Sequence, residues 1–271
     1  MTQISILGCG WLGLPLAKAL LKSGFAVNGS TTSVDKLSVL KNLGIQVFQI
    51  ELSETKIQGE IDSFLENSKI LIIDIPPKLR GISKEDFVGK IQTLIPFIEK
   101  STVESVLFIS STSVYGEDNL VVTEKSELNP DTESGRQLVK TEQLLQSNPN
   151  FKTTILRFGG LLGEDRHPIK FLAGRTNIEN PDAPINLIHQ EDCIGTITAI
   201  LCHTEPDEVW KETFNAVAPF HPSRKEYYIQ KAVDMNLALP EFNAENSSFG
   251  KTISSSKIEK VLGYAFVKPM L

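Results

Sequence analysis

This sequence has few cysteines, no net positive charge and no long apolar run, and each of these absences argues against a class of protein. The chain has 3 cysteines at irregular spacings, which argues against a disulfide framework or a zinc site, so we expect reduced thiols and no metal. Because 33 acidic residues outnumber 27 basic ones, we expect no nucleic acid partner. No apolar stretch approaches the roughly 20 residues that span a bilayer, so we expect a cytoplasmic protein with no membrane partner.

Of the 271 residues, 41% are hydrophobic and 22% are charged. This composition is typical of a globular protein with a substantial core. Short apolar runs alternate with segments of helical period, which predicts a parallel sheet with crossover helices. The predicted strands are Ile4–Leu7, Ala26–Gly29, Gln46–Ile50, Ile70–Asp74, Ser105–Ile109, Thr153–Arg157 and Thr213–Val217. The predicted helices are Leu14–Lys22, Val34–Asn42, Ile61–Glu66, Lys84–Glu99, Ser134–Gln146 and Glu191–Cys202.

The predicted fold class is α/β, with a Rossmann-type doubly wound parallel sheet and a smaller C-terminal substrate lobe. Residues 1–157 are predicted to form the dinucleotide-binding core, and residues 190–218 are predicted to return to it. Glycine, proline and asparagine become frequent after residue 158. We therefore expect residues 158–189 and 219–271 to form the smaller lobe on the substrate side.

A glycine-rich turn, Gly8-x-Gly10-x-x-Gly13, joins the first predicted strand to the first predicted helix. In such a turn the first glycine permits the tight bend, the second admits a pyrophosphate and the third lets the helix pack on the strand. The phosphates would then lie at a helix N-terminus, which favours anions. We predict that a dinucleotide binds at this turn, at Gly8, Gly10, Trp11, Leu12 and Gly13, although a purely structural turn is the alternative.

The end of the second predicted strand bears on the choice between NAD and NADP. An acidic residue there would bind the ribose hydroxyls of NAD, and none is present. The segment holds hydroxyl and ammonium groups instead, at Ser30, Thr31, Thr32, Ser33 and Lys36. We therefore favour NADP over NAD, and the alternative is a polar turn that caps the next helix. Pro76 is expected to shape the cofactor pocket, whereas Asp74 could serve either packing or chemistry.

The segment Val106–Gly116 resembles the extended short-chain dehydrogenase/reductases, the group that contains the nucleotide-sugar epimerases and dehydratases. Further similar segments follow in the order of that family and cover nearly the whole chain: Ile155–Gly163, Asn186–Asp192, Phe214–Val217 and Ser256–Tyr264. The resemblance implies that Ser111 hydrogen-bonds the reacting oxygen of the substrate.

The second family motif, Tyr-x-x-x-Lys, is absent where the resemblance places it. Ser134 stands at the position of the tyrosine and Leu138 at that of the lysine, and neither can transfer the proton. Lys140 is expected to face away, because it lies two residues further along the helix. Tyr115 is the candidate substitute acid. These departures, together with the shorter glycine motif, resemble the atypical branch of the family.

The resemblance also implies that the lobe binds the substrate through basic and polar groups. We expect contacts from arginines, which pair with phosphate oxygens through two parallel hydrogen bonds, and from histidines, at Arg157, Arg166, His167 and His189. The nearby Lys170 and Arg175 fit a solvated surface equally well. His189 could also be a packing residue.

Two functions of different class remain open. The first is an NADP- or NAD-dependent oxidoreductase or epimerase acting on a phosphorylated or nucleotide-linked sugar-like small molecule. The second is a cofactor-binding sensor without turnover, which the loss of the tyrosine and lysine favours. An apolar stripe at Phe87, Ile91, Leu94 and Ile98 would suit either a homodimer interface or the protein core.

Overall fold

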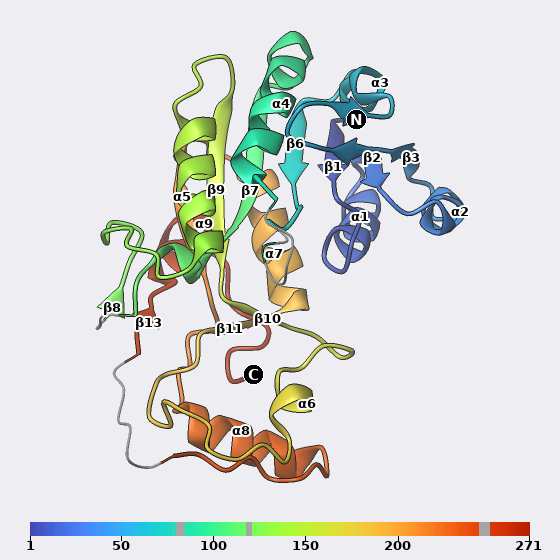
Figure 1. Cartoon of the computed structure of the whole chain (residues 1–271). Coiled ribbons are helices and arrows are strands. Elements are labelled where there is room, and N and C mark those ends of the chain that lie inside the picture. The colour runs from blue at the N-terminus through green and yellow to red at the C-terminus, as the bar shows by residue number, and fades with distance from the viewer. Residues whose placement is uncertain (78, 80–84, 118–120, 244–249) are drawn as a thin grey trace.

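The computed structural model describes residues 1–77, 79, 85–117, 121–243 and 250–271. The strands of its main sheet are β1 (Gln3–Leu7), β2 (Ala26–Thr31), β3 (Gln46–Gln49), β6 (Ile70–Ile73), β7 (Ser105–Ser111), β9 (Lys152–Phe158) and β12 (Thr213–Ala216). Within the described residues these strands form one seven-stranded parallel sheet in the order β12-β9-β7-β6-β1-β2-β3 (Figure 1). This order confirms the predicted doubly wound α/β fold.

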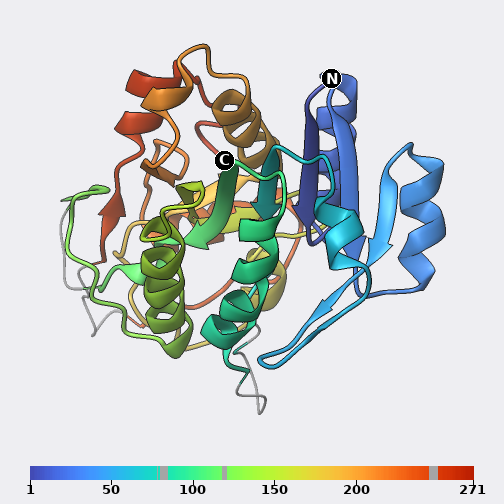
Figure 2. The same ribbon diagram turned by 90° about the horizontal axis from the view of Figure 1, so that it is seen from above.

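Helices cover both faces of this sheet, as Figure 2 shows from above. One apolar core lies beneath α3 (Ile61–Leu65), α4 (Phe87–Lys100) and α5 (Glu133–Gln146). The other lies beneath α1 (Gly13–Lys22), α2 (Asp35–Asn42), α7 (Gln190–Leu201) and α9 (Ser256–Leu262). The strands are therefore buried on both sides, which explains why their sequences are apolar throughout.

The apolar stripe of α4 packs into the first of these cores. Phe87, Ile91, Leu94 and Ile98 are all buried, and Asp86 caps the helix by accepting a hydrogen bond from Gly89. The stripe is thus a core surface and presents no exposed apolar face. The predicted start of this helix, Lys84, lies outside the described residues.

A smaller lobe lies beyond the carboxyl ends of the strands, at the bottom of Figure 1. It contains α6 (Ile169–Leu172), α8 (Arg224–Asp234) and the strand pair β10 (Gly160–Leu162) and β11 (Leu187–His189), packed around a core of its own. Two further short pairs, β4 (Glu51–Leu52) with β5 (Ile57–Gln58) and β8 (Val121–Val122) with β13 (Thr252–Ile253), lie outside the main sheet. Single-turn 3₁₀ segments occur at η1 (Thr112–Val114) and η2 (Pro206–Glu208).

Asp192 anchors the last part of the chain against the first turn of α7. Its buried carboxylate accepts hydrogen bonds from the Tyr264 hydroxyl at 2.7 Å and from the backbone amides of Val267 and Lys268 at 2.6 and 3.0 Å. Hydrogen bonds to a charged acceptor are among the stronger ones in proteins. This contact holds the segment around Lys268 beside the lobe.

The described helices include none that is long and apolar enough to cross a membrane. Among all the residues that the structure describes, there is no group of three or more His, Cys, Asp or Glu side chains that could hold a metal ion. Cys9, Cys193 and Cys202 are free thiols.

Candidate functional site

The glycine-rich turn lies where β1 ends, and its three glycines meet different constraints. Gly8 has a φ of +110°, and a Cβ there would lie 2.4 Å from the carbonyl oxygen of Asp74. A Cβ on Gly13 would lie 2.2 Å from the carbonyl oxygen of Gly8. At Gly10, by contrast, an added Cβ would meet no described atom within 4 Å. The fold thus requires the first and third glycines, whereas the second faces open space.

Helix α1 begins directly at this turn. Its N-cap is the buried Leu12, and among the described residues no side chain caps the helix and no acidic residue occupies its first turn. The first amides of a helix lack partners within the helix and carry a partial positive charge. The N-terminus of α1 is therefore suited to bind an anion beside the open surface at Gly10.

The hydroxyl groups at the end of β2 and just after it divide into two sets. The Ser30 hydroxyl lies beneath the turn, where it accepts a hydrogen bond from the Gly8 amide at 3.0 Å, and Thr31 Oγ1 accepts one from the Ser33 amide at 3.1 Å. Both residues are buried, so the structure argues against the expectation that Ser30 and Thr31 bind a 2′-phosphate. Thr32 and Lys36 are exposed and Ser33 is half-buried, so these three remain available.

Asp74 follows β6 and lies against the floor of the turn. Burial raises the pKa of its carboxyl group to about 8, although a hydrogen bond from the Gly13 amide lowers it in part. Burial also raises the pKa of the neighbouring Cys9 thiol to about 12 and that of Cys193 well above its usual value. The floor of the turn is therefore mostly uncharged at neutral pH and opposes an incoming anion little.

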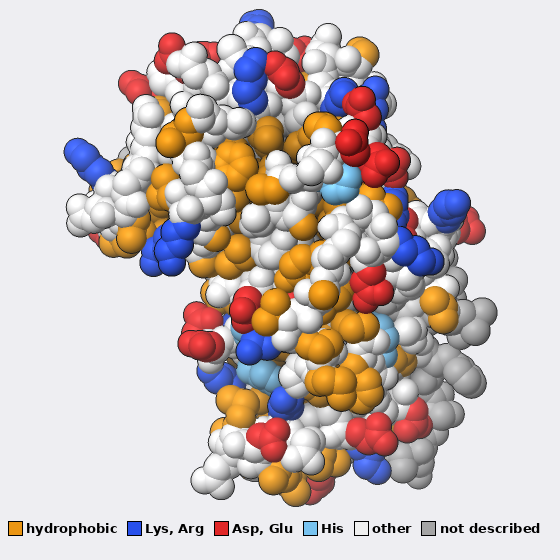
Figure 3. Space-filling view, turned by 180° about the vertical axis from the view of Figure 1, so that it is seen from behind, with side chains coloured by type: hydrophobic (Ala, Val, Ile, Leu, Met, Phe, Trp, Pro, Cys, Tyr) orange, Lys and Arg blue, Asp and Glu red, His pale blue; other side chains and the backbone are white. Residues whose placement is uncertain are grey.

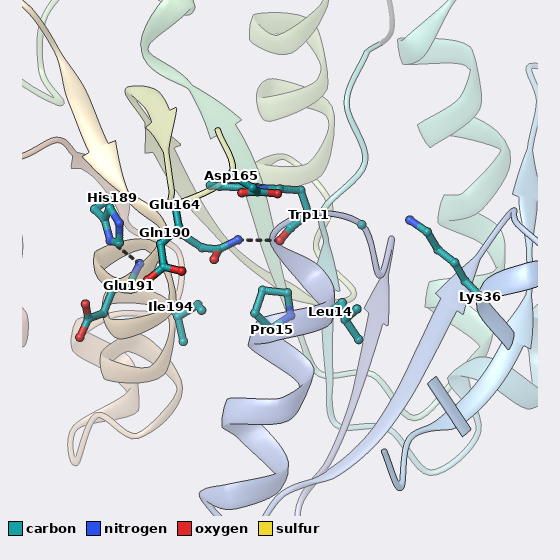
Figure 4. A pocket seen from close by; sticks show the side chains of 11 residues that line it. Trp11, Leu14, Pro15, Lys36, Glu164, Asp165, His189, Gln190, Glu191 and Ile194 are labelled. Atoms are coloured by element: carbon teal, nitrogen blue, oxygen red, sulfur yellow. Dashed lines mark hydrogen bonds between the residues drawn. The ribbon is translucent and has the colours of Figure 1, made fainter. Parts of the chain in front are cut away.

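The larger cavity, of about 770 Å³, begins at this turn and extends toward the lobe (Figure 4). Figure 3 shows the surface hollowed where the sheet-containing part meets the lobe. The cavity lining comes from the turn, α1, α2, the segment after β10, the end of β11, and α7: Gly10, Trp11, Leu14, Pro15, Lys36, Glu164, Asp165, His189, Gln190, Glu191 and Ile194. Pro76 is exposed next to the end of β6.

Trp11 connects the glycine-rich turn to the lobe. Its indole Nε1 donates a hydrogen bond to Asp165 at 2.9 Å, and its carbonyl oxygen accepts one from the Gln190 side chain at 2.7 Å. The Arg166 guanidinium lies over the indole, 5.1 Å from the ring centroid. The predicted substrate residue Arg166 thus lies beside the glycine-rich turn.

A smaller cavity of about 240 Å³ lies within the lobe and shares Glu164 and His189 with the larger one. Two predicted substrate residues, His167 and His189, line it. Tyr227 and Lys231 of α8 line the same cavity, and neither residue was predicted from the sequence. The signal that could have found them is the capping box of Ser223 and Glu226, which marks the start of α8.

Ser111 and Tyr115, the two catalytic candidates, lie in different environments. Ser111 is half-buried at the carboxyl end of β7, where its hydroxyl accepts a hydrogen bond from the Ser113 amide at 3.1 Å. Tyr115 is only 2% exposed, and its hydroxyl accepts a hydrogen bond from Arg157 at 2.6 Å and donates one to Asn215 at 2.9 Å. Burial raises the pKa of this hydroxyl. The structure therefore argues against Tyr115 as a substitute acid.

Arg157, another expected substrate contact, is also buried in the core. Its guanidinium forms an ion pair with Glu142 of α5 at 2.6 Å, and the two residues are 4% and 1% exposed. Ser110 donates a further hydrogen bond to Glu142 at 2.5 Å. Because Arg157 is committed to Glu142 and Tyr115, the structure argues against a contact between Arg157 and substrate.

The start of α5 shows what has replaced the family tyrosine and lysine. Ser134 lies half-buried in the first turn, and Leu138 packs into the core at 3% exposure. Lys140 is exposed. The described part of α5 therefore supplies no phenol and ammonium pair at this position.

Comparison with known proteins places the chain in a family. No protein-family model matches it. It is 34% identical to Protein YeeZ of Escherichia coli (strain K12) over 272 aligned residues, which cover 99% of this chain and 97% of that protein. The chain belongs to the YeeZ family.

Solved structures share the fold of this YeeZ-family chain. A functionally unknown conserved protein from Silicibacter pomeroyi superposes with a TM-score of 0.79 at 23% identity, covering 99% of this chain and 95% of that one. The UDP-glucuronic acid 4-epimerase of Bacillus cereus, solved in complex with NAD, superposes with a TM-score of 0.78 at 20% identity, covering 98% and 94%. Both structures share the Rossmann-type α/β fold predicted from the sequence.

Proposed function

We propose that this protein binds a nicotinamide dinucleotide at the glycine-rich turn and acts as an oxidoreductase or epimerase on a phosphorylated or nucleotide-linked sugar-like substrate. The observation that carries the proposal is the open surface at Gly10, beside the uncapped N-terminus of α1. This surface lies at the carboxyl ends of β1 and β6, where the strand order reverses, and doubly wound sheets bind ligands at such a point. The NAD complex of the Bacillus cereus epimerase, which has the same fold, supports the choice of cofactor.

The chain's own residues would hold and orient this cofactor. The first amides of α1 would bind the pyrophosphate, and Thr32, Ser33 and Lys36 would favour the 2′-phosphate of NADP over NAD. When bound, the nicotinamide supplies or accepts a hydride. Ser111, at the end of the central strand β7, would donate a hydrogen bond to the reacting oxygen of the substrate.

The proposal is tested by titrating the purified protein with NADPH and NADH, and then following nicotinamide absorbance with a panel of nucleotide sugars and sugar phosphates. We expect the reduced cofactor to bind, NADPH more tightly. An oxidoreductase should consume it with a substrate from this panel, whereas an epimerase should form an epimerised product without net consumption. Ser111→Ala should lower turnover about tenfold, the effect of one lost hydrogen bond, with unchanged cofactor affinity. Failure of the wild-type protein to bind either dinucleotide would contradict the proposal.

A sensor that binds the cofactor without turnover is the second candidate. The observation that favours it is the replacement of both proton-transfer residues by Ser134 and Leu138, together with the burial of Tyr115 in the core. Tight dinucleotide binding without any redox or epimerised product across the panel would select this function over the enzyme.

Asp74 makes a pH dependence of dinucleotide binding testable. Its pKa is raised to about 8 by burial, so the carboxyl group is mainly protonated at pH 7 and ionises above pH 8. An ionised carboxylate beneath the turn would repel the pyrophosphate, so we expect the affinity for NADPH to fall about tenfold as pH rises from 7 to 9.5. In Asp74→Asn the affinity should stay constant over this range.

Asp62→Asn, which changes an exposed carboxylate of α3, is the matched control for this pH series. It should retain the pH dependence of the wild-type protein. The same decline in Asp74→Asn as in the wild type would assign the titration to another group.

A further inference from the structure

A chain of hydrogen bonds at the smaller cavity runs from the Ile169 amide through His167 to the Tyr227 hydroxyl, and it determines the orientation of the Tyr227 hydroxyl proton. The backbone amide of Ile169 donates a hydrogen bond to His167 Nδ1 at 3.1 Å, so this nitrogen is an unprotonated acceptor. Burial, with help from the nearby charges of Lys231 and Lys170, lowers the pKa of His167 to about 4. The imidazole is therefore neutral at pH 7 and carries its proton on Nε2.

This proton fixes the role of Tyr227. His167 Nε2 and the Tyr227 hydroxyl lie 3.1 Å apart, so the histidine donates and the hydroxyl oxygen accepts. Burial raises the pKa of Tyr227, which keeps the phenol protonated. Its own hydroxyl proton has no hydrogen-bond acceptor among the described residues and is free to point into the cavity that Tyr227 lines.

His189 presents a second proton to the same cavity by the same logic. Its Nδ1 accepts a hydrogen bond from the Glu191 amide at 3.3 Å, as the dashed line in Figure 4 shows, so Nδ1 carries no proton and the ring N–H is on Nε2. Both histidines are thus held in one tautomer by a backbone amide. The wall of the smaller cavity therefore contains two side chains with a hydrogen-bond donor that no described residue accepts, Tyr227 and His189.

Positive charge accompanies these donors. Lys231 lies one helical turn after Tyr227 on α8, and its ammonium lies over the Tyr227 ring, 5.5 Å from the centroid. Lys268, whose backbone amide bonds to Asp192 and whose ammonium lies 3.9 Å from the Glu191 carboxylate, also lines the cavity. The acidic residues of the lining, Glu164 and Asp234, are exposed at its rim. Tyr227 and the half-buried Lys231 therefore line the interior, whereas Lys268 and the two carboxylates are exposed to solvent, and Lys231 also approaches Asp234 at 4.0 Å.

We propose that the smaller cavity binds the oxyanion of a small sugar-like molecule, a phosphate or a carboxylate, through the Tyr227 hydroxyl, His189 Nε2 and the Lys231 ammonium. The rim carboxylates of Glu164 and Asp234 would accept hydrogen bonds from the hydroxyl groups of the same ligand. This inference rests on the proposed function, because it names the substrate class for that cleft.

The volume decides between the two substrate classes that the proposed function leaves open. Pockets for drug-sized ligands commonly measure about 300–1,000 Å³. The smaller cavity, at about 240 Å³, suits a single sugar that carries one anionic group. It is too small to hold a sugar together with an attached nucleoside diphosphate. The larger cavity is assigned to the dinucleotide, so the structure favours a sugar phosphate or a sugar acid over a nucleotide sugar.

The test is calorimetric titration of the full chain with glucose 6-phosphate, glucuronate, glucose and UDP-glucose. We expect glucose 6-phosphate or glucuronate to bind at least tenfold more tightly than glucose and UDP-glucose, and the tighter of the two identifies the oxyanion. Tyr227→Phe should weaken that binding about tenfold, because one hydrogen bond to a charged group is lost. Lys231→Gln should weaken it to a similar extent.

Tyr228→Phe is the matched control, because the adjacent Tyr228 is equally buried and does not line the cavity. It should bind the anionic sugar as the wild type does. Equal affinity of the wild type for all four compounds, or unchanged affinity in Tyr227→Phe, would overturn the inference. A parallel NADPH titration keeps the two proposals separate, since anionic sugar binding without dinucleotide binding would contradict only the proposed function.

Discussion

Replacing Glu142 by alanine is expected to lower the free energy of unfolding by about 3–5 kcal/mol, because the change leaves a buried guanidinium without its counter-charge. Arg157 is 4% exposed and uses Glu142 as its ion-pair partner at 2.6 Å. The hydrogen bond from Ser110 to the same carboxylate is lost as well. Urea denaturation of the wild type and Glu142→Ala would measure the difference.

Glu133→Ala provides the matched control on the same helix. Glu133 forms an ion pair with Arg136 at 2.9 Å, but both side chains are at least half exposed to solvent. Exposed pairs contribute little to stability, so the urea midpoint of Glu133→Ala should stay close to that of the wild type. A similar loss of unfolding free energy in both variants would show that the buried ion pair with Arg157 contributes no more to stability than the exposed pair, and would contradict the prediction.

Replacing Gly10 by alanine is expected to weaken NADPH binding about a hundredfold, since the methyl group would keep the pyrophosphate away from the first amides of α1. The fold itself should tolerate the change, because a Cβ at this position meets no described atom within 4 Å. Fluorescence titration measures the affinity, and urea denaturation of the same sample measures the stability.

Substitution of either flanking glycine, Gly8 or Gly13, should lower the stability of the fold, which Gly10→Ala should leave unchanged. In Gly13→Ala the new Cβ would lie 2.2 Å from the Gly8 carbonyl oxygen, so the turn itself must shift and the protein should lose stability. Gly8→Ala adds strain at a φ of +110°.

Wild-type affinity in Gly10→Ala would place the dinucleotide elsewhere and contradict the proposed function.

Much of the sheet could be predicted from the sequence, because buried parallel strands are continuous apolar runs with turn residues at their ends. The predicted Ser105–Ile109 and Thr153–Arg157, for example, correspond to β7 and β9, each extended by one or two residues. The strands outside this sheet were not predicted. Pairs such as β8 and β13 are only two residues long, which is too short for any periodicity.

The candidate site was harder to predict, because side-chain direction depends on contacts that are distant in the sequence. Arg157 lies on a strand and Glu142 on the preceding helix, and no local spacing links them. Ser30 and Thr32 have similar hydroxyls, but only the structure shows that Ser30 lies beneath the turn and Thr32 outside it. The glycine-rich turn was predictable because its glycines act through the local backbone.

The contact between Trp11 and the segment after β10 gives the protein an optical reporter of its own. The chain has two tryptophans, and Trp11 is the one that lies in the glycine-rich turn. Its indole nitrogen donates a hydrogen bond to Asp165, and the Arg166 guanidinium lies over its ring. The polarity around the indole therefore depends on how closely the lobe approaches the turn. With Trp210 replaced by phenylalanine, the remaining emission would come from the contact between the glycine-rich turn and the segment after β10 alone.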